Sequence, residues 1–162
     1  MRIAYTLPKG KLVLTELSDT LREAGIRTCG IVQAETVTTD RHRCDMDVRV
    51  LPDGPEIPIT QSLGKEASGC RLNTAALAQA AGEVAQRIDE PFDVFILNKF
   101  GEQEANGSGF RDLIVKALES GADVLVGTND INIDAFKEFS GGIAEFIEPD
   151  VAVLKAWIEN RP

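Results

Sequence analysis

Short apolar runs alternate with helix-patterned segments along most of this chain. The clearest runs are FDVFIL at residues 92–97 and DVLVGT at 123–128, and apolar runs of this length are typical of strands that are covered on both faces. Other segments carry apolar residues at helical spacing, such as the Ala-rich segment 73–88. Strands that alternate with helices in this way predict a three-layer α/β domain with a mostly parallel sheet.

The N-terminal third of the chain predicts a βαβ unit followed by a hairpin. A strand, a turn at 7–11 and a leucine-rich helix lead into a second apolar run that starts at Ile26. The next segment alternates apolar and polar side chains before Asp53-Gly54, a dipeptide typical of tight turns, which predicts an inserted β-hairpin at about 45–61. Further along, the sequence predicts a loop at 62–72, a helix at 73–88, a loop at 99–109, a helix from Phe110, a short helix at 135–139, a strand at 143–147 and a final helix with Asp150 as N-cap.

Length, charge and cysteine content narrow the class of protein. The 162 residues, of which 43% are hydrophobic, are typical of a single domain covering 1–162. The formal net charge of −9 at pH 7 is unfavourable for binding nucleic acid or an anionic membrane surface. The three cysteines, Cys29, Cys44 and Cys70, show no CxxC spacing, and no segment resembles a signal peptide or a membrane span. A cytoplasmic protein without a metal site is therefore expected.

The loop after the first strand resembles a phosphate-binding loop that has lost several of its parts. A functional loop has the pattern Gly-x4-Gly-Lys-Ser/Thr, in which backbone N–H groups, the lysine and a magnesium-binding hydroxyl surround the phosphates. Aligning Gly10-Lys11 with the Gly-Lys pair puts Tyr5 at the first glycine and Leu12 at the hydroxyl position. What remains is a helix N-terminus beside Lys9 and Lys11, which attracts anions. The alternative is a solvated turn with two surface lysines.

The loop after residues 92–97 is the second candidate, since ligands of open α/β sheets lie beyond the carboxyl ends of the strands. Phosphate-transferring enzymes of this architecture place a carboxylate there to hold magnesium, whereas this chain has Asn98 and Lys99. Both side chains are candidates for binding an anion. Glu102 and Glu104 follow in the same loop and are candidate general bases, or else solvated loop acids.

Arginines gather on both sides of the predicted hairpin. Arg41 and Arg43 precede it and Arg71 follows it, and arginine forks bind oxyanions bidentately. Because a hairpin returns the chain to the place where it left the sheet, the two loops are expected to meet and to clamp an oxyanion. The alternative is that these arginines pair with nearby acids such as Asp45 and Glu66.

Two family resemblances follow from these motifs. NKFGEQE at 98–104 with FRDL at 110–113 resembles the Asp-Glu-Ile-Gly-Lys-Met-Glu…Phe motif of the thermophilic-type nucleoside-triphosphatase family of P-loop proteins, although the motif's acidic pair falls on Asn98 and Lys99. Together with CDMDVRVLPDG at 44–54, GCRL at 69–72 and GTND at 127–130, the chain more closely resembles an uncharacterised bacterial domain family often encoded beside molybdate-transport genes. The resemblance implies a P-loop-NTPase-like fold with degenerate motifs, and nucleotide or molybdate as ligand.

The leading hypothesis is a regulatory or accessory protein that binds a small anionic ligand, either a nucleotide or an oxyanion. It is linked to molybdenum metabolism through a molybdenum-linked protein partner, and its hydrolysis is lost or weak. One alternative is an active nucleoside triphosphatase in which Lys11 binds phosphate and Glu102 or Glu104 polarises water. The other is a scaffold that binds no ligand and forms a homo-oligomer.

Overall fold

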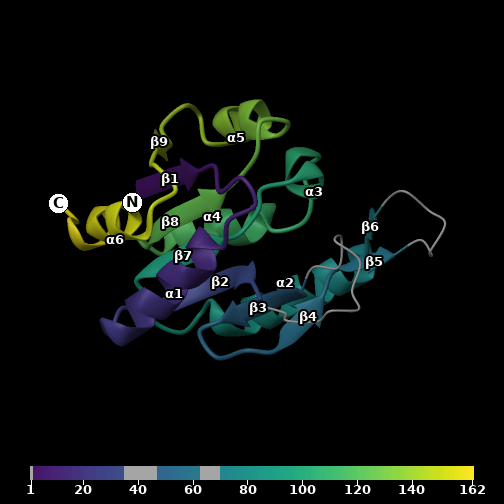
Figure 1. Ribbon diagram of the computed structural model, residues 1–162, viewed down its shortest axis with the longest axis horizontal. Coiled ribbons are helices and arrows are strands. Elements are labelled where there is room, and N and C mark those ends of the chain that lie inside the picture. The colour runs from purple at the N-terminus through teal and green to yellow at the C-terminus, as the bar shows by residue number, and fades with distance from the viewer. Residues whose placement is uncertain (1, 35–46, 63–69) are drawn as a thin grey trace.

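A seven-stranded sheet with helices on both faces forms the body of the protein (Figure 1). The computed structural model describes residues 2–34, 47–62 and 70–162. The strand order is β4-β3-β2-β7-β8-β1-β9, in which the strands from β2 to β9 are parallel and the hairpin β3–β4 is antiparallel. The predicted three-layer α/β fold with a mostly parallel sheet is therefore confirmed.

The strands of this sheet have the burial that the apolar runs predict. The central strands β7 and β8 are buried along their whole length, because helices cover both of their faces. The strands are β1 (Arg2–Thr6), β2 (Thr28–Gln33), β3 (Asp47–Leu51), β4 (Glu56–Pro58), β7 (Val94–Leu97), β8 (Asp123–Gly127) and β9 (Glu145–Phe146).

The helices form the two outer layers. Leucines of α1 and α6 pack on one face of the sheet, and the apolar sides of α2, α4 and α5 pack on the other. Side-chain N-caps fix the starts of α2 and α6. The Asn73 side chain accepts a hydrogen bond from the Ala76 N–H, and the Asp150 side chain accepts one from the Val153 N–H. The helices are α1 (Val13–Glu23), α2 (Thr74–Arg87), α3 (Glu102–Ala105), α4 (Arg111–Glu119), α5 (Ile133–Phe139) and α6 (Val151–Glu159).

The hairpin β3–β4 turns at the predicted dipeptide. The Gly54 N–H donates to the Val50 carbonyl at 2.8 Å, and the Val50 N–H donates to the Pro55 carbonyl at 3.0 Å. The end of the predicted hairpin differs, because Thr60–Ser62 forms β5 of a separate two-stranded sheet with β6 (Cys70–Leu72). Part of the predicted loop 62–72 is thus a strand, and the predicted loop 99–109 contains the single turn of α3.

None of the helices in the described part of the chain is both long and apolar enough to cross a bilayer.

Candidate functional site

A pocket of about 250 Å³ lies where β1, β2, β7 and β8 end. This is the edge at which open α/β sheets bind ligands. Every residue that lines it lies at the end of one of these strands, in the segment that follows it, or in the first turn of α1. The lining residues are Pro8, Lys9, Gly10, Lys11, Leu12, Leu14, Thr15, Gln33, Asn98, Lys99, Thr128 and Asn129. The structure thus brings together Lys9, Gly10, Lys11, Asn98 and Lys99, the strand-end residues singled out from the sequence.

A tight turn joins β1 to α1. Lys9 and Gly10 both have positive φ, 51° and 80°, and the Lys11 N–H donates to the Pro8 carbonyl at 3.1 Å. Two successive residues with positive φ reverse the chain over a very short distance. The turn therefore presents Lys9 and Lys11 at the pocket, but it leaves no long loop of free amides to wrap around a polyphosphate.

Helix α1 begins at the pocket without a side-chain cap. Its N-cap is Leu12, which has no side chain able to accept a hydrogen bond from the first turn. The N–H groups of a helix's first turn have no partner within the helix and carry partial positive charge. Thr15 uses its hydroxyl to donate to the Gln33 carbonyl at 2.6 Å, which ties α1 to the end of β2. The amide end of α1 is therefore fixed beside the pocket.

Backbone hydrogen bonds position the segment that carries Asn98 and Lys99. The Asn98 N–H donates to the Ile31 carbonyl at 3.1 Å, and the Phe100 N–H donates to the Gly127 carbonyl at 2.7 Å. Glycine is required at position 127, because a Cβ there would collide with the Asn98 carbonyl oxygen. The Thr128 hydroxyl closes the arrangement by donating to the Phe100 carbonyl at 3.0 Å.

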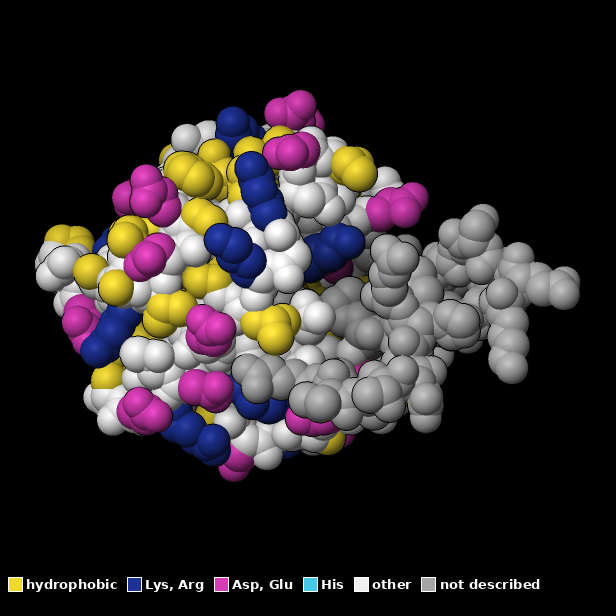
Figure 2. Space-filling view, in the orientation of Figure 1, with side chains coloured by type: hydrophobic (Ala, Val, Ile, Leu, Met, Phe, Trp, Pro, Cys, Tyr) yellow, Lys and Arg dark blue, Asp and Glu magenta, His cyan; other side chains and the backbone are white. Residues whose placement is uncertain are grey.

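The charge of the pocket is positive although the whole chain is acidic. Lys9, Lys11 and Lys99 are exposed side chains, and within the described residues none of them forms an ion pair. No Asp or Glu of the described part of the chain lines this pocket. Figure 2 shows Lys and Arg side chains near the middle of the face where the loops after β1 and β7 lie in Figure 1. An anion is the ligand that this arrangement attracts.

The two glutamates proposed from the sequence as bases lie outside this pocket. Glu102 is exposed at the start of α3. Glu104 is 4% exposed, and its carboxylate accepts hydrogen bonds from the N–H groups of Gly101 at 2.9 Å and Phe110 at 3.1 Å. With both oxygens bonded to the backbone, Glu104 ties Gly101 at the start of α3 to Phe110 at the start of α4. This contact has a structural role and places no base beside a pocket ligand.

The predicted arginine clamp falls largely outside the described residues. Arg41 and Arg43 belong to the segment 35–46, which is not described. The backbone of Arg71 lies in β6 opposite Gln61. The clamp remains a prediction.

The residues that line the pocket are better suited to bind a simple anion than to bind a nucleoside triphosphate together with magnesium. P-loop proteins hold the metal with the hydroxyl after the lysine and with a carboxylate at a strand end. Here those positions carry Leu12 and Asn98, and neither supplies a charged oxygen. Within the described residues, no group of three or more His, Cys, Asp or Glu residues could hold a metal ion. The lysines and the α1 amides remain suitable for phosphate or another oxyanion.

The sequence identified the loops that form this site, but it did not identify every residue that lines the pocket. Gln33 and Asn129 line the pocket, yet only their positions at strand ends, and no motif, marked them in advance. The Asn129 side chain accepts hydrogen bonds from the N–H groups of Ile131 at 3.1 Å and Asn132 at 2.9 Å, so it also shapes its own loop.

Comparisons with known proteins give one family model, one relative and one solved structure that are similar to this chain. A family model described as "Protein of unknown function (DUF2478)" matches residues 5–157. The chain is 35% identical over 145 residues to a "Molybdenum import ATP-binding protein ModC 2" of Bradyrhizobium diazoefficiens. The match covers 90% of this chain but only 16% of the length of that relative. Its fold is similar to the crystal structure of THEP1 from the hyperthermophile Aquifex aeolicus, with a TM-score of 0.68 at 18% identity over 99% of this chain and 96% of that one.

Proposed function

This chain belongs to the family described as "Protein of unknown function (DUF2478)", and we propose that it binds a small oxyanion, or the phosphate of a nucleotide, in the strand-end pocket. In this proposal the protein is a ligand-binding accessory protein and its hydrolytic activity is lost or weak. The alternative of a scaffold without any ligand leaves the pocket's lysines without a role.

The convergence of Lys9, Lys11 and Lys99 carries the proposal. They come from two loops that are far apart in the sequence, and they meet at the uncapped start of α1 in a chain of net charge −9. Three ammonium groups around a pocket with no carboxylate among its described lining residues give it a positive potential, which attracts an anion. Each direct hydrogen bond between a charged donor and an oxyanion contributes on the order of 1.5–3 kcal/mol.

The size of the pocket favours an oxyanion or a phosphate group over an enclosed whole nucleotide. Pockets that enclose drug-sized ligands usually measure roughly 300–1,000 Å³. The pocket here measures about 250 Å³. A tetrahedral oxyanion such as phosphate or molybdate fits within it, whereas the base and ribose of a nucleotide would extend into solvent.

The lack of a carboxylate supports binding without efficient turnover. Phosphoryl transfer needs a metal that neutralises the phosphates and a group that orients the attacking water. Among the described pocket residues, the polar groups nearest to that task are the amides of Asn98 and Gln33, which are neutral and not basic. Lys11 can bind a phosphate, but nothing beside it in the described structure removes a proton from water.

The molybdenum link rests on the relative named as a molybdenum import ATP-binding protein. In that relative, the stretch similar to this chain is part of a much longer polypeptide, of which this chain spans 16%. We propose that this chain takes molybdate as its oxyanion and that its partner is an ATP-binding subunit of a molybdate importer. Mixing the two proteins with and without molybdate and measuring complex formation by size-exclusion chromatography tests the partner.

Thermal unfolding with a panel of anions tests the ligand. The panel contains ATP, GTP, molybdate, tungstate, sulfate and phosphate at millimolar concentration. A ligand at about 100 times its dissociation constant stabilises the native state by roughly 2.7 kcal/mol, a shift that is readily measured. We expect a shift with at least one oxyanion, at least a tenfold loss of affinity in Lys11→Ala, and no change in Lys137→Ala, a control on α5 outside the pocket.

The outcomes separate the candidate functions. No shift with any anion, or equal shifts in wild type and Lys11→Ala, contradicts the proposed site. Steady phosphate release from ATP or GTP that Lys11→Ala abolishes establishes the hydrolase instead. Release that the substitution leaves unchanged indicates a contaminating enzyme.

A further inference from the structure

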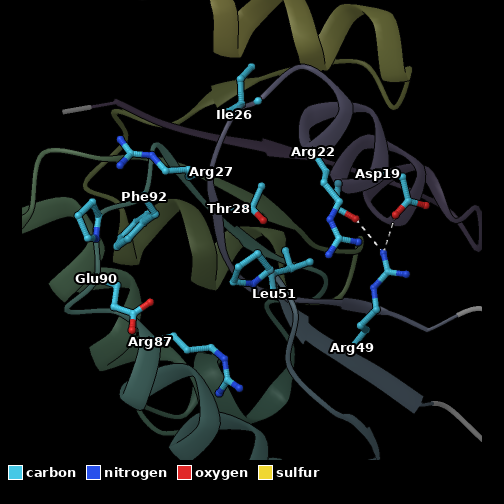
Figure 3. A pocket seen from close by; sticks show the side chains of 14 residues that line it. Asp19, Arg22, Ile26, Arg27, Thr28, Arg49, Leu51, Arg87, Glu90 and Phe92 are labelled. Atoms are coloured by element: carbon cyan, nitrogen blue, oxygen red, sulfur yellow. Dashed lines mark hydrogen bonds and ion pairs between the residues drawn. The ribbon is translucent and has the colours of Figure 1, made fainter.

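We propose that this protein has a second binding site, for a small zwitterionic molecule, at the opposite edge of the sheet. A pocket of about 370 Å³ lies there, between the end of α1, the start of β2, the end of β3 and the segment after α2 (Figure 3). It is larger than the strand-end pocket and shares no residue with it. Its volume lies within the range of roughly 300–1,000 Å³ that is usual for small-molecule sites.

The middle of this pocket is apolar. Ile26, Leu51 and Phe92 line it together with Pro52 and Pro91. These residues come from three separate segments of the chain, and Figure 3 shows Phe92 to the left of Thr28 and Leu51 below it. A concave apolar surface with a few polar groups around it is the usual composition of a small-molecule site.

Most of the charged side chains around the pocket are already paired. Arg27 holds Asp93 through its backbone N–H at 2.9 Å and through two guanidinium contacts at 3.3 and 3.2 Å. Those side-chain hydrogen bonds keep the pKa of the Asp93 carboxyl below its usual range. Arg49 donates to Asp19 at 2.9 Å and to Ser18 at 3.1 Å, and Arg87 donates to Glu83 at 2.8 Å. These ion pairs shape the walls and leave little net charge.

Two charges of opposite sign remain unpaired. Within the described residues, Arg22 on α1 and Glu90 after α2 have no ion-pair or hydrogen-bond partner for their side chains. Figure 3 shows them on opposite sides of the pocket, with Thr28 between them. Thr28 is only 6% exposed, and its hydroxyl forms no hydrogen bond to another described residue. It is therefore available to a ligand in the middle of the pocket.

This arrangement has the chemistry of a receptor for a dipolar molecule. A carboxylate would bind the Arg22 guanidinium, an ammonium group would bind the Glu90 carboxylate, and an apolar body would lie on Leu51 and Phe92 between them. A simple anion is less suitable, because Glu90 repels it and because α1 and α2 both end at this pocket, where helix dipoles are negative. The inference is independent of the ligand proposed for the strand-end pocket.

Three matched probes test the proposal by isothermal titration calorimetry. 4-(Aminomethyl)benzoate carries both charges on a benzene ring, benzoate carries only the anion, and benzylamine carries only the cation. We expect the zwitterion to bind wild type about tenfold or more tightly than either single-charge probe, since each charged contact contributes the equivalent of roughly tenfold in affinity. Equal affinities for the three probes would contradict the proposal.

Charge-removing variants assign each end of the probe. Arg22→Gln should lower the affinity for 4-(aminomethyl)benzoate to that for benzylamine, and Glu90→Gln should lower it to that for benzoate. Lys137→Gln and Glu138→Gln on α5, which contributes no residue to this pocket, are the matched controls and should bind like wild type. Because Arg22 and Glu90 are exposed, both variants should keep the wild-type melting temperature.

The same variants separate this proposal from the strand-end site. Binding of the zwitterion should be unchanged in Lys11→Ala, whatever the outcome of the anion panel. Zwitterion binding that Lys11→Ala weakens and Arg22→Gln does not would show that the probe enters the strand-end pocket, and the second site would be wrong.

Discussion

Glu104 is the residue whose role differs most between sequence and structure. Its carboxylate accepts the N–H groups of Gly101 and Phe110 in a buried place. Glu104→Ala leaves both amides without an acceptor, and each buried unsatisfied group costs about 1–3 kcal/mol. We therefore expect the free energy of unfolding, measured in urea, to fall by about 2–5 kcal/mol.

Glu102→Ala is the matched control for that measurement. Glu102 is exposed on the same short helix, so its removal should change the free energy of unfolding by about 0.5 kcal/mol or less. An unchanged urea midpoint in Glu104→Ala would contradict the structural role and would return Glu104 to the list of candidate bases.

Cys29 gives a pH-dependent prediction. Burial of the thiol in β2 raises its pKa from 9.0 to about 11. Between these values the unfolded chain loses the thiol proton and the native chain keeps it, so the native state binds more protons and stability falls as pH rises. Below pH 9 the contribution is fully present, and it is lost as pH rises through about 11.

The measurement compares urea unfolding between pH 8 and pH 10.5 for Cys44→Ser/Cys70→Ser with and without Cys29→Ala. Other groups titrate equally in both proteins, so the difference isolates Cys29. We expect a steeper alkaline loss of stability when Cys29 is present. Equal slopes in the two proteins would be inconsistent with a raised thiol pKa.

At the scale of elements, strand β2 depends on a glycine at its centre. Gly30 has φ of +114°, and a Cβ at this position would collide with the carbonyl oxygen of Ile96 in the neighbouring strand β7. Gly30→Ala should therefore separate β2 from β7 and abolish folding, seen as loss of soluble protein and of far-ultraviolet circular dichroism.

Gly82 offers the opposite case within a helix. It lies in α2, and nothing lies within 4 Å of the position that a Cβ would occupy. Because alanine favours a helix more than glycine does, Gly82→Ala should raise the free energy of unfolding by about 0.5–1 kcal/mol. A soluble, native-like Gly30→Ala together with a destabilised Gly82→Ala would mean that these backbone environments are assigned wrongly.

The sequence predicted the elements with a strong local signal. The buried strands β7 and β8, the hairpin turn at Gly54, the helix α2 and the capped start of α6 all follow from the pattern of neighbouring residues. Three-residue strands such as β5 and β6 are too short to show a period, so β5 was predicted mostly as the end of the hairpin and β6 as loop. The placement of β7 and β8 between β2 and β1 depends on long-range pairing, which a local pattern does not contain.

The candidate sites also show that a local sequence pattern does not reveal which distant residues meet in the fold. The strand-end pocket was predicted in outline, because topology alone places ligands at that edge and the sequence marks its lysines. The opposite pocket was not predicted, since Arg22, Leu51 and Glu90 lie on separate elements with no common spacing. Only the folded chain shows which of its charges are paired and which are free.

At the scale of the whole molecule, one buried carboxylate joins the two ends of the chain. Asp123 on β8 is 2% exposed at its side chain and binds Arg2 at 2.6 Å and Arg161 at 3.1 Å. Arg2 also stacks over Trp157 of α6 at 4.2 Å. In Figure 1 both termini lie beside α6. These contacts hold α6 against its face of the sheet.

Asp123→Ala should destabilise the whole fold, because it leaves the largely buried Arg2 without its partner. Breaking a buried ion pair costs about 3–5 kcal/mol, whereas Arg161→Ala removes a partly exposed partner and should cost about 1 kcal/mol or less. The fluorescence of Trp157, the only tryptophan of the chain, reports the unfolding in urea. Equal effects of the two substitutions would argue against a central role for Asp123.

Helix α1 is a wall of both pockets. Its start contributes Leu12 and Thr15 to the strand-end pocket, and its end contributes Ser18 and Arg22 to the opposite one. The 11 residues of α1 form a stiff rod of roughly 16 Å, so a ligand that draws one end inward moves the wall of the other site. If the two ligands favour different positions of this rod, thermodynamic reciprocity requires each to change the affinity of the other by one common factor. Titrating either ligand against protein saturated with the other measures that factor.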